Sequence, residues 1–92
     1  MKIEHVEGKQ KGKIMLYALS TCVWCSKTKK HLGELGVDYY YANVDKLSPE
    51  ERQEAEKEIM KWNPQCSFPT IVFNDSNCVV GYNPDEIGKN LK

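Results

Sequence analysis

Short apolar runs alternate with longer amphipathic stretches along the chain, and this alternation predicts its strands and helices. Residues 14–19 are apolar throughout, which is typical of a strand buried on both faces. Residues 38–44 are rich in tyrosine and end in valine, a composition that favours a strand. Residues 70–73 and 78–80 flank the polar turn Asn-Asp-Ser-Asn, so they predict a hairpin.

The first predicted helix covers residues 23–35. Thr28, Leu32 and Leu35 recur at helical spacing within it, so we expect these three side chains on its inner face. Gly36 follows directly and is a typical helix stop, because glycine readily adopts the left-handed conformation that ends many helices.

Two later helices begin at caps that contain proline. Ser-Pro-Glu-Glu at residues 48–51 is a capping box with proline at the first helical position, and its helix reaches about Lys61 before Asn63-Pro64 ends it. Asn-Pro-Asp-Glu at residues 83–86 repeats the cap and begins a short last helix. The positions expected to be buried are Ala55, Ile59 and Trp62 in the second helix and Ile87 and Leu91 in the last.

The predicted order of elements is β-α-β-α-β-β-α, which belongs to the α/β class. The early strand–helix–strand unit implies a right-handed crossover between parallel strands, and the later hairpin adds antiparallel strands. We therefore expect a four-stranded mixed sheet flanked by three helices, with both faces covered. Residues 1–12 are polar and predict a flexible lead-in, whereas residues 13–92 are expected to form a single domain.

Composition and charge exclude several kinds of partner. Hydrophobic residues make up 40% of the chain, which is enough for a packed interior. Thirteen basic and thirteen acidic side chains cancel, so bulk charge gives no attraction to nucleic acid. No apolar stretch approaches the ~20 residues that cross a bilayer, and the polar N-terminus lacks a secretory segment. We expect a cytoplasmic monomer that does not bind membranes.

Four cysteines carry the candidate chemistry, and their spacing divides them into one close pair and two single residues. Cys22 and Cys25 form a Cys-x-x-Cys motif that directly follows an apolar strand and begins a helix. Cys66 and Cys78 stand apart from it and from each other. Without a secretory segment, this spacing indicates one working site and two other thiols rather than a disulfide framework. Of these two, Cys66 is the candidate for an extra redox or regulatory thiol.

The position of the close pair predicts thiol–disulfide exchange. Cys22 stands at a helix N-terminus, where unpaired N–H groups and the positive end of the helix dipole favour a thiolate over a thiol. Cys25 lies one turn further in and is expected to be more buried, so it suits the step that resolves a mixed disulfide. One alternative is a zinc site that Cys66 and Cys78 complete. Another is a partner-binding domain that retains the fold without chemistry.

Three motifs occur in a fixed order along the chain. They are Thr-Cys-Val-Trp-Cys at residues 21–25, Ser-Phe-Pro-Thr at 67–70 and Val-Gly-Tyr-Asn-Pro-Asp at 80–85. Over roughly residues 13–91 the chain thereby resembles the glutaredoxins and the related small redoxins that reduce ribonucleotide reductase. The resemblance implies a thioredoxin-like fold and a dithiol oxidoreductase that reduces protein or low-molecular-weight disulfides, with no tightly bound cofactor. Some glutaredoxins without proline inside the active-site motif bind an iron–sulfur cluster between two chains, so a metal- or iron–sulfur-binding module is the alternative.

The resemblance also implies roles for individual residues. Pro69 stands at the family's cis-proline position, where Phe68 would present its backbone to an extended substrate. Trp24 suits stacking against a substrate peptide or glutathione. Gly81 has no side chain, so its backbone can come close to a ligand. The expected substrate-binding residues are Trp24, Phe68, Pro69, Gly81 and Tyr82, and the expected catalytic residues are Cys22 and Cys25.

The sequence departs from the glutathione-binding glutaredoxins at two places. Leu19 stands three residues before Cys22, where those proteins usually carry a lysine. Residues 81–85 replace their paired-glycine acidic segment and are more similar to the ribonucleotide-reductase redoxins. Both changes remove expected contacts to the carboxylates of glutathione. The expected partners are disulfide-bearing proteins and, as the source of electrons, either a thiol such as glutathione or a flavin- or iron–sulfur-dependent reductase.

Overall fold

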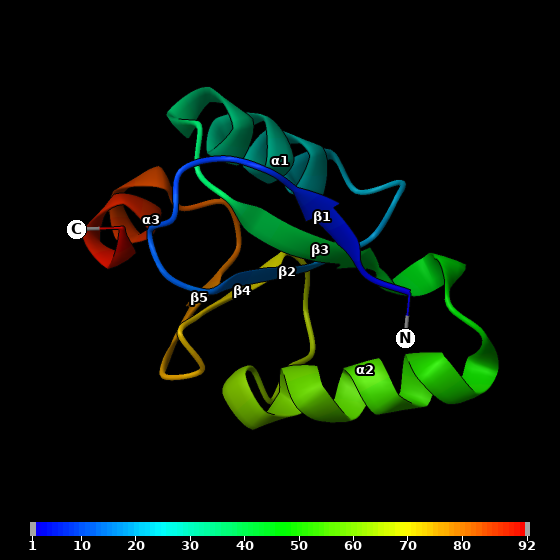
Figure 1. Cartoon of the computed structure of the whole chain (residues 1–92). Helices are drawn as coiled ribbons and strands as arrows, with labels where there is room; N and C mark the ends of the chain where they lie inside the picture. Colours follow the sequence, from blue (N-terminus) through cyan, green and yellow to red (C-terminus); the bar gives the residue numbers. More distant parts are fainter. Residues whose placement is uncertain (1, 92) are drawn as a thin grey trace.

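A computed structural model describes residues 2–91 as one β-sheet with helices on both faces (Figure 1). The elements are β1 (Glu4–Val6), β2 (Ile14–Ala18), α1 (Val23–Leu35), β3 (Tyr39–Asn43), a 3₁₀ turn (Val44–Lys46), α2 (Pro49–Trp62), β4 (Thr70–Phe73), β5 (Asn77–Val80) and α3 (Pro84–Asn90). From β2 onward this order confirms the predicted succession of strands and helices and the thioredoxin-like α/β class. Within residues 2–91 no helix is long and apolar enough to cross a membrane.

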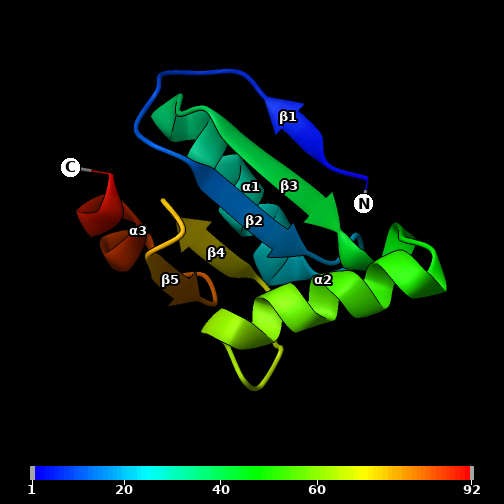
Figure 2. The same cartoon turned by 60° about the horizontal axis from the view of Figure 1, so that its bottom comes forward.

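The sheet has five strands in the order β1-β3-β2-β4-β5, seen side by side in Figure 2. β2 and β3 are parallel, with Leu16 opposite Tyr41, and α1 connects them. The other neighbouring strands are antiparallel, and β4 and β5 form the predicted hairpin. This mixed arrangement places the end of β2, where the cysteine motif begins, in the middle of the sheet.

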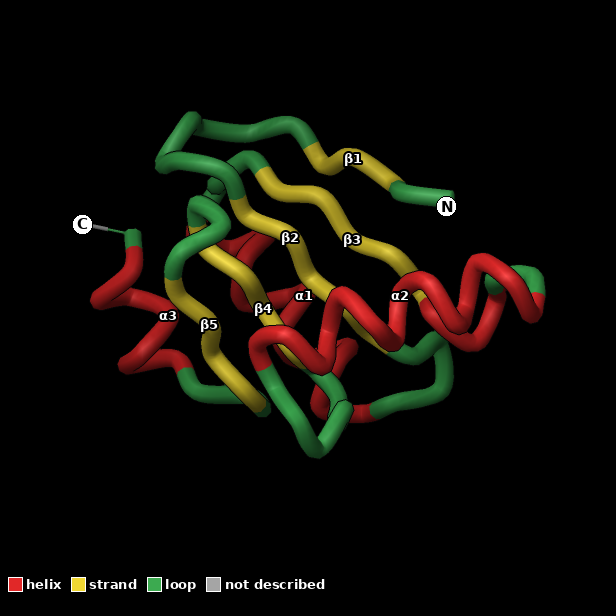
Figure 3. The backbone as a smooth tube through the Cα atoms, turned by 90° about the horizontal axis from the view of Figure 1, so that it is seen from below, coloured by secondary structure: helices red, strands yellow, loops and turns green. Residues whose placement is uncertain are grey.

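Two apolar clusters hold the layers together. α1 and α3 cover one face of the sheet, and α2 crosses the other (Figures 1 and 3). The first cluster includes Leu16, Leu32, Ile71, Phe73 and Ile87, and the second includes Tyr17, Val44, Ala55, Ile59 and Val72. Neighbouring residues of β2 and β4 therefore enter opposite clusters, which explains why both strands are apolar throughout.

The N-terminal segment differs from the prediction. Instead of a flexible lead-in over residues 1–12 and four strands, the described part of this segment contains β1, which pairs with β3 as the fifth strand. Asp38 anchors it, because its Oδ1 lies 2.8 Å from His5 Nε2 and accepts a hydrogen bond from the Gly8 N–H at 3.2 Å. A Cβ at Gly8 would lie 2.5 Å from the Val37 backbone, so only glycine fits this close approach. Pairing with β3 and contacts to residues distant in the sequence hold this strand, so the local hydrophobic pattern does not reveal it.

The predicted first helix has the bounds that the structure gives α1, but one of its inner-face positions is wrong. Gly36 ends the helix in the left-handed conformation with φ 68°, as expected. Leu35, however, is 43% exposed. The buried side chains of α1 are Cys25, Thr28 and Leu32. The inner face of α1 therefore runs from Cys25 to Leu32 and does not extend to Leu35.

The later helices follow the predicted caps. The Ser48 hydroxyl accepts a hydrogen bond from the Glu51 N–H at 3.3 Å, and the Glu51 carboxylate accepts one from the Ser48 N–H, which completes the capping box. Ala55 and Ile59 are buried as expected, whereas Trp62 is only half-buried. In the last helix Ile87 is buried as expected, whereas Leu91 follows the end of α3 as its C-cap and is partly buried against the first cluster.

Candidate active site

Cys22 is the N-cap of α1. Its backbone is extended, with φ −88° and ψ 120°, and its Sγ accepts a hydrogen bond from the Cys25 N–H at 3.2 Å. One of the first-turn N–H groups, which have no partner within the helix, thus points at the sulfur. The positive end of the helix dipole points the same way, so negative charge on this sulfur is stabilised where it stands.

The loop that leads from β2 to Cys22 is fastened by Asp45. Ser20 donates its N–H to Asp45 Oδ1 at 2.9 Å and its hydroxyl to Oδ2. These two hydrogen bonds lower the pKa of Asp45, the hydroxyl contributing most, and so keep the carboxylate ionised as an acceptor. The Cys22 N–H also donates to the Leu19 carbonyl at 3.3 Å. The Cys22 sulfur is therefore presented by a loop with a defined backbone.

Cys25 lies behind Cys22 and is fully buried. Burial raises the pKa of Cys25 to about 12, and the neighbouring Cys22 side chain acts on the thiol in the same direction. A thiol with this pKa stays protonated and weakly nucleophilic at neutral pH. It is also shielded from solvent. Cys22 is thus the partly accessible cysteine of the pair, and Cys25 is the buried one.

A pocket of about 260 Å³ lies beside the cysteine motif, and its lining brings together residues from three distant parts of the chain. The lining residues are Trp24, Phe68, Pro69, Gly81 and Tyr82. These are the five residues for which the sequence predicts substrate binding. Phe68 and Cys22 pack against the same core cluster, to which Cys25 belongs. The pocket therefore adjoins the cysteine pair through a shared layer of side chains.

Trp24 forms one wall of this pocket from the first turn of α1. It is 55% exposed, and its ring stacks on Tyr82 with centroids 6.0 Å apart and planes 23° from parallel. Lys27 Nζ lies 4.6 Å from the Trp24 ring centroid, a distance suited to a cation–π contact. His31 meets the edge of Tyr82 at 6.1 Å. α1 and the loop before α3 are thus joined by aromatic contacts, and Trp24 remains more than half exposed beside the pocket.

The opposite wall is the Phe68–Pro69 segment, whose peptide bond is cis. The Gly81 N–H donates to the Pro69 carbonyl at 2.8 Å, directly beyond the last pair of the β4–β5 hairpin. Gly81 has φ 82°, a backbone conformation that residues other than glycine rarely adopt. The hairpin therefore carries both segments of this wall in a fixed relation.

The remaining thiols lie on the α2 side of the sheet. The Cys78 thiol donates to the Trp62 carbonyl at 3.5 Å, and Cys66 packs partly against the second cluster. Burial raises the pKa of both thiols. Within the described part of the chain there is no group of three or more His, Cys, Asp or Glu side chains that could hold a metal ion. The four cysteines therefore do not converge on one tetrahedral site.

Two side-chain contacts near the pocket are not found by sequence reasoning. Lys27 is one of several lysines in α1, and nothing in the pattern distinguishes the one that contacts Trp24. Asn63 is interpreted from the sequence only as a helix end, yet its side chain bonds to both Ser67 and Thr70. The sequence feature that could have pointed to Asn63 is an asparagine at a helix C-terminus, followed by hydroxyl residues four and seven positions later.

The chain is similar to known redox proteins in sequence. The Glutaredoxin family model matches residues 14–78. A glutaredoxin-like 8.6 kDa protein in the rubredoxin operon of Clostridium pasteurianum is 36% identical over 76 residues, which cover 83% of this chain and 93% of that protein.

Solved structures give the same result. The glutaredoxin of Methanosarcina mazei Go1 superposes with a TM-score of 0.93 at 47% identity and covers 99% of this chain and 88% of its own. The methanoredoxin of Methanosarcina acetivorans superposes with a TM-score of 0.89 at 49% identity, covering 91% and 88%. The chain belongs to the glutaredoxin family of redox proteins.

Proposed function

We propose that this protein is a dithiol oxidoreductase that reduces disulfides through Cys22 and Cys25. The observation that carries the proposal is the hydrogen bond from the Cys25 N–H to the Cys22 sulfur at the N-terminus of α1, with the Cys25 thiol buried behind it. The first cysteine is thereby prepared to attack. The second is protected until the first is occupied.

The reaction takes place in two exchanges. In the first, the Cys22 thiolate attacks one sulfur of a substrate disulfide, so that an S–S bond forms to the protein while the substrate S–S bond breaks, and the departing substrate thiolate takes up a proton. In the second, Cys25 gives up its proton and attacks the Cys22 sulfur. A Cys22–Cys25 disulfide forms, the second substrate thiol leaves, and two electrons have passed from the protein to the substrate.

The pocket indicates what kind of substrate segment lies beside the disulfide. Its lining consists of the aromatic residues Trp24, Phe68 and Tyr82 together with Pro69 and Gly81. Aromatic rings favour apolar or planar groups, and Phe68, beside a proline that has no N–H of its own, would offer its backbone to an extended peptide. We therefore infer that the substrates are proteins with a disulfide in an extended, accessible segment.

Substitution of each cysteine tests the proposal. Cys22→Ser should abolish reduction of insulin disulfides, because no sulfur remains to form the mixed disulfide. Cys25→Ser should instead accumulate the mixed disulfide, which mass spectrometry detects as the mass of substrate joined to protein. Cys66→Ser and Cys78→Ser serve as matched controls and should reduce insulin at the wild-type rate. Full activity of Cys22→Ser would contradict the proposal.

The source of electrons is a second part of the proposal. Position 19, where glutathione-binding relatives usually carry lysine, is a leucine packed against the second cluster. We infer that a reductase dependent on flavin or an iron–sulfur centre reduces the oxidised protein more efficiently than glutathione does. Supplying the oxidised protein with glutathione and its reductase, or with thioredoxin reductase, tests this inference by counting regenerated thiols. Faster regeneration by glutathione would contradict it.

A further inference from the structure

Asn63 lies at the C-terminal end of α2, only 5% exposed, and its side chain reaches away from the helix toward the pocket wall. Its Nδ2 lies 2.9 Å from the Ser67 hydroxyl, 3.3 Å from the Ser67 carbonyl and 3.1 Å from Thr70 Oγ1. Its Oδ1 accepts from the Gln65 N–H at 3.2 Å. One amide is therefore bonded at three places in the segment that follows the helix.

The partners of this amide fix its orientation. The Thr70 hydroxyl donates to the Ser67 carbonyl at 2.7 Å, so its oxygen is left to accept from Asn63. A carbonyl can only accept, and a backbone N–H can only donate. The NH₂ group must therefore face Ser67 and Thr70, and the oxygen must face Gln65. Each polar atom of this buried side chain is used.

The two residues that Asn63 joins stand immediately before and after Phe68–Pro69. Thr70 is fully buried and is the first residue of β4, so this end of the bridge is attached to an inner strand of the sheet. The Gly81 N–H holds the Pro69 carbonyl from the other side. Hydrogen bonds from the hairpin hold the Phe68–Pro69 segment on one side, and hydrogen bonds from Asn63 hold its flanking residues on the other.

We propose that Asn63 is a positioning residue of the redox site, which holds the Phe68–Pro69 segment in the orientation that presents a substrate disulfide to Cys22. The inference rests on the proposed dithiol chemistry. The Asn63 side chain is hydrogen-bonded to Ser67, Thr70 and Gln65 and not to the cysteine pair, so its effect is on substrate binding and not on the intrinsic reactivity of the sulfur.

The test is Asn63→Asp, which keeps the size of the side chain and replaces the NH₂ donor by an acceptor facing the Ser67 carbonyl. Pre-reduced protein is mixed with increasing insulin in a single turnover. At about pH 8 we expect the insulin concentration for half-maximal rate to rise about tenfold, a loss comparable to one buried hydrogen bond. The reaction amplitude and the alkylation rate of Cys22 by iodoacetamide should remain at wild-type values.

The pH dependence gives a signature that a general loss of structure does not. Burial among acceptors raises the pKa of the introduced carboxyl above that of an exposed aspartate, so lowering the pH returns a proton to it and restores one donor. The difference between Asn63→Asp and wild type in the insulin concentration for half-maximal rate should therefore become smaller at low pH. Circular dichroism should show both proteins fully folded at every pH used.

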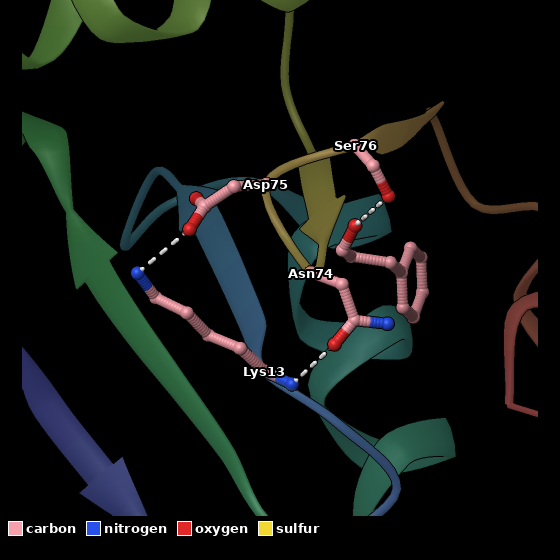
Figure 4. A network of polar contacts seen from close by, with 5 residues as sticks. Lys13, Asn74, Asp75 and Ser76 are labelled. Atoms are coloured by element: carbon pink, nitrogen blue, oxygen red, sulfur yellow. Dashed lines mark hydrogen bonds and ion pairs between the residues drawn. The ribbon is translucent and has the colours of Figure 1, made fainter.

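The matched control is Asn74→Asp at the other end of β4. Figure 4 shows Asn74 Oδ1 accepting from the Lys13 N–H, at 2.8 Å. A carboxylate oxygen can accept that bond equally well, so the same chemical change should leave half-saturation unchanged. If Asn63→Asp does not fold, the pair Thr70→Val and Thr70→Ser replaces it, because only the first removes the bridging hydroxyl.

Three results would overturn the inference. The first is that folded Asn63→Asp reaches its half-maximal rate at the wild-type insulin concentration. The second is that its Cys22 alkylation rate falls along with insulin reduction, and the third is that Thr70→Val and Thr70→Ser behave alike. Wild-type protein that alkylates at Cys22 but never reduces insulin would instead refute the proposed function, and the inference with it.

Discussion

The buried thiol of Cys25 makes the stability of the reduced protein depend on alkaline pH. Its pKa in the folded state is about 12, whereas an unfolded cysteine titrates near ~8.5. Between these values the folded protein holds a proton that the unfolded chain releases. Stability from this group is therefore complete below the pKa of the unfolded thiol and is lost as the pH rises toward that of the folded thiol.

The size of the loss follows from proton linkage. One proton bound only in the folded state lowers the free energy of unfolding by about 1.4 kcal/mol for each pH unit above the unfolded pKa. Between about pH 8 and about pH 10 the expected loss from Cys25 is therefore about 2 kcal/mol. Burial also raises the pKa of Tyr17 and Tyr39, and both add to the loss in the same direction.

A comparison of wild type with Cys25→Ala isolates the cysteine, because the tyrosines are common to both proteins. Urea unfolding of the reduced proteins at the two pH values gives four free energies of unfolding. The alanine variant is less stable at both, owing to its cavity, but we expect wild type to lose about 2 kcal/mol more than the variant on alkalinisation. Equal losses would refute the reasoning, since they would mean that Cys25 titrates alike in the folded and unfolded states.

Three further predictions concern the pocket, the core and the edge strand. Trp24→Ala removes the stack on Tyr82 and should raise the insulin concentration for half-maximal rate by about three- to tenfold, measured in single turnovers. Leu32→Ala opens a cavity in the first cluster and should lower the free energy of unfolding by about 2–5 kcal/mol in urea titrations. The His5 hydrogen bond lowers the pKa of Asp38. The stability that this carboxylate adds is therefore present at a pH above the pKa of an unfolded aspartate and is lost on acidification. Amide exchange in β1 should accordingly be faster in Asp38→Asn than in wild type, and unchanged exchange would contradict the anchor.

The sequence predicts the succession of elements from β2 onward because each boundary has a local cause. Gly36 ends α1, and the Ser48 capping box begins α2. β1 has no such cause within its own residues, since it depends on Asp38 and on the close approach at Gly8. Leu35 illustrates the same limit in a helix, because helical spacing does not say where the neighbouring sheet ends.

The candidate site shows a similar division. The resemblance to a known family identified the residues that line the pocket, and the structure brings them together around Trp24 and Tyr82. Spacing alone could place Cys22 at the helix start, because the strand, the motif and the helix are consecutive. Asn63 could not be found in this way, since its role depends on which way a buried amide points after the helix has ended.

The most direct test of the account is the alkylation rate of Cys22 in the reduced protein as a function of pH, measured in a variant with serine at positions 66 and 78. The account predicts that Cys22 reacts with iodoacetamide faster than a thiol in an unstructured peptide at about pH 6.5, where the peptide thiol is almost wholly protonated. A rate profile that coincides with that of the peptide would contradict the claim that the N-terminus of α1 prepares this sulfur for attack.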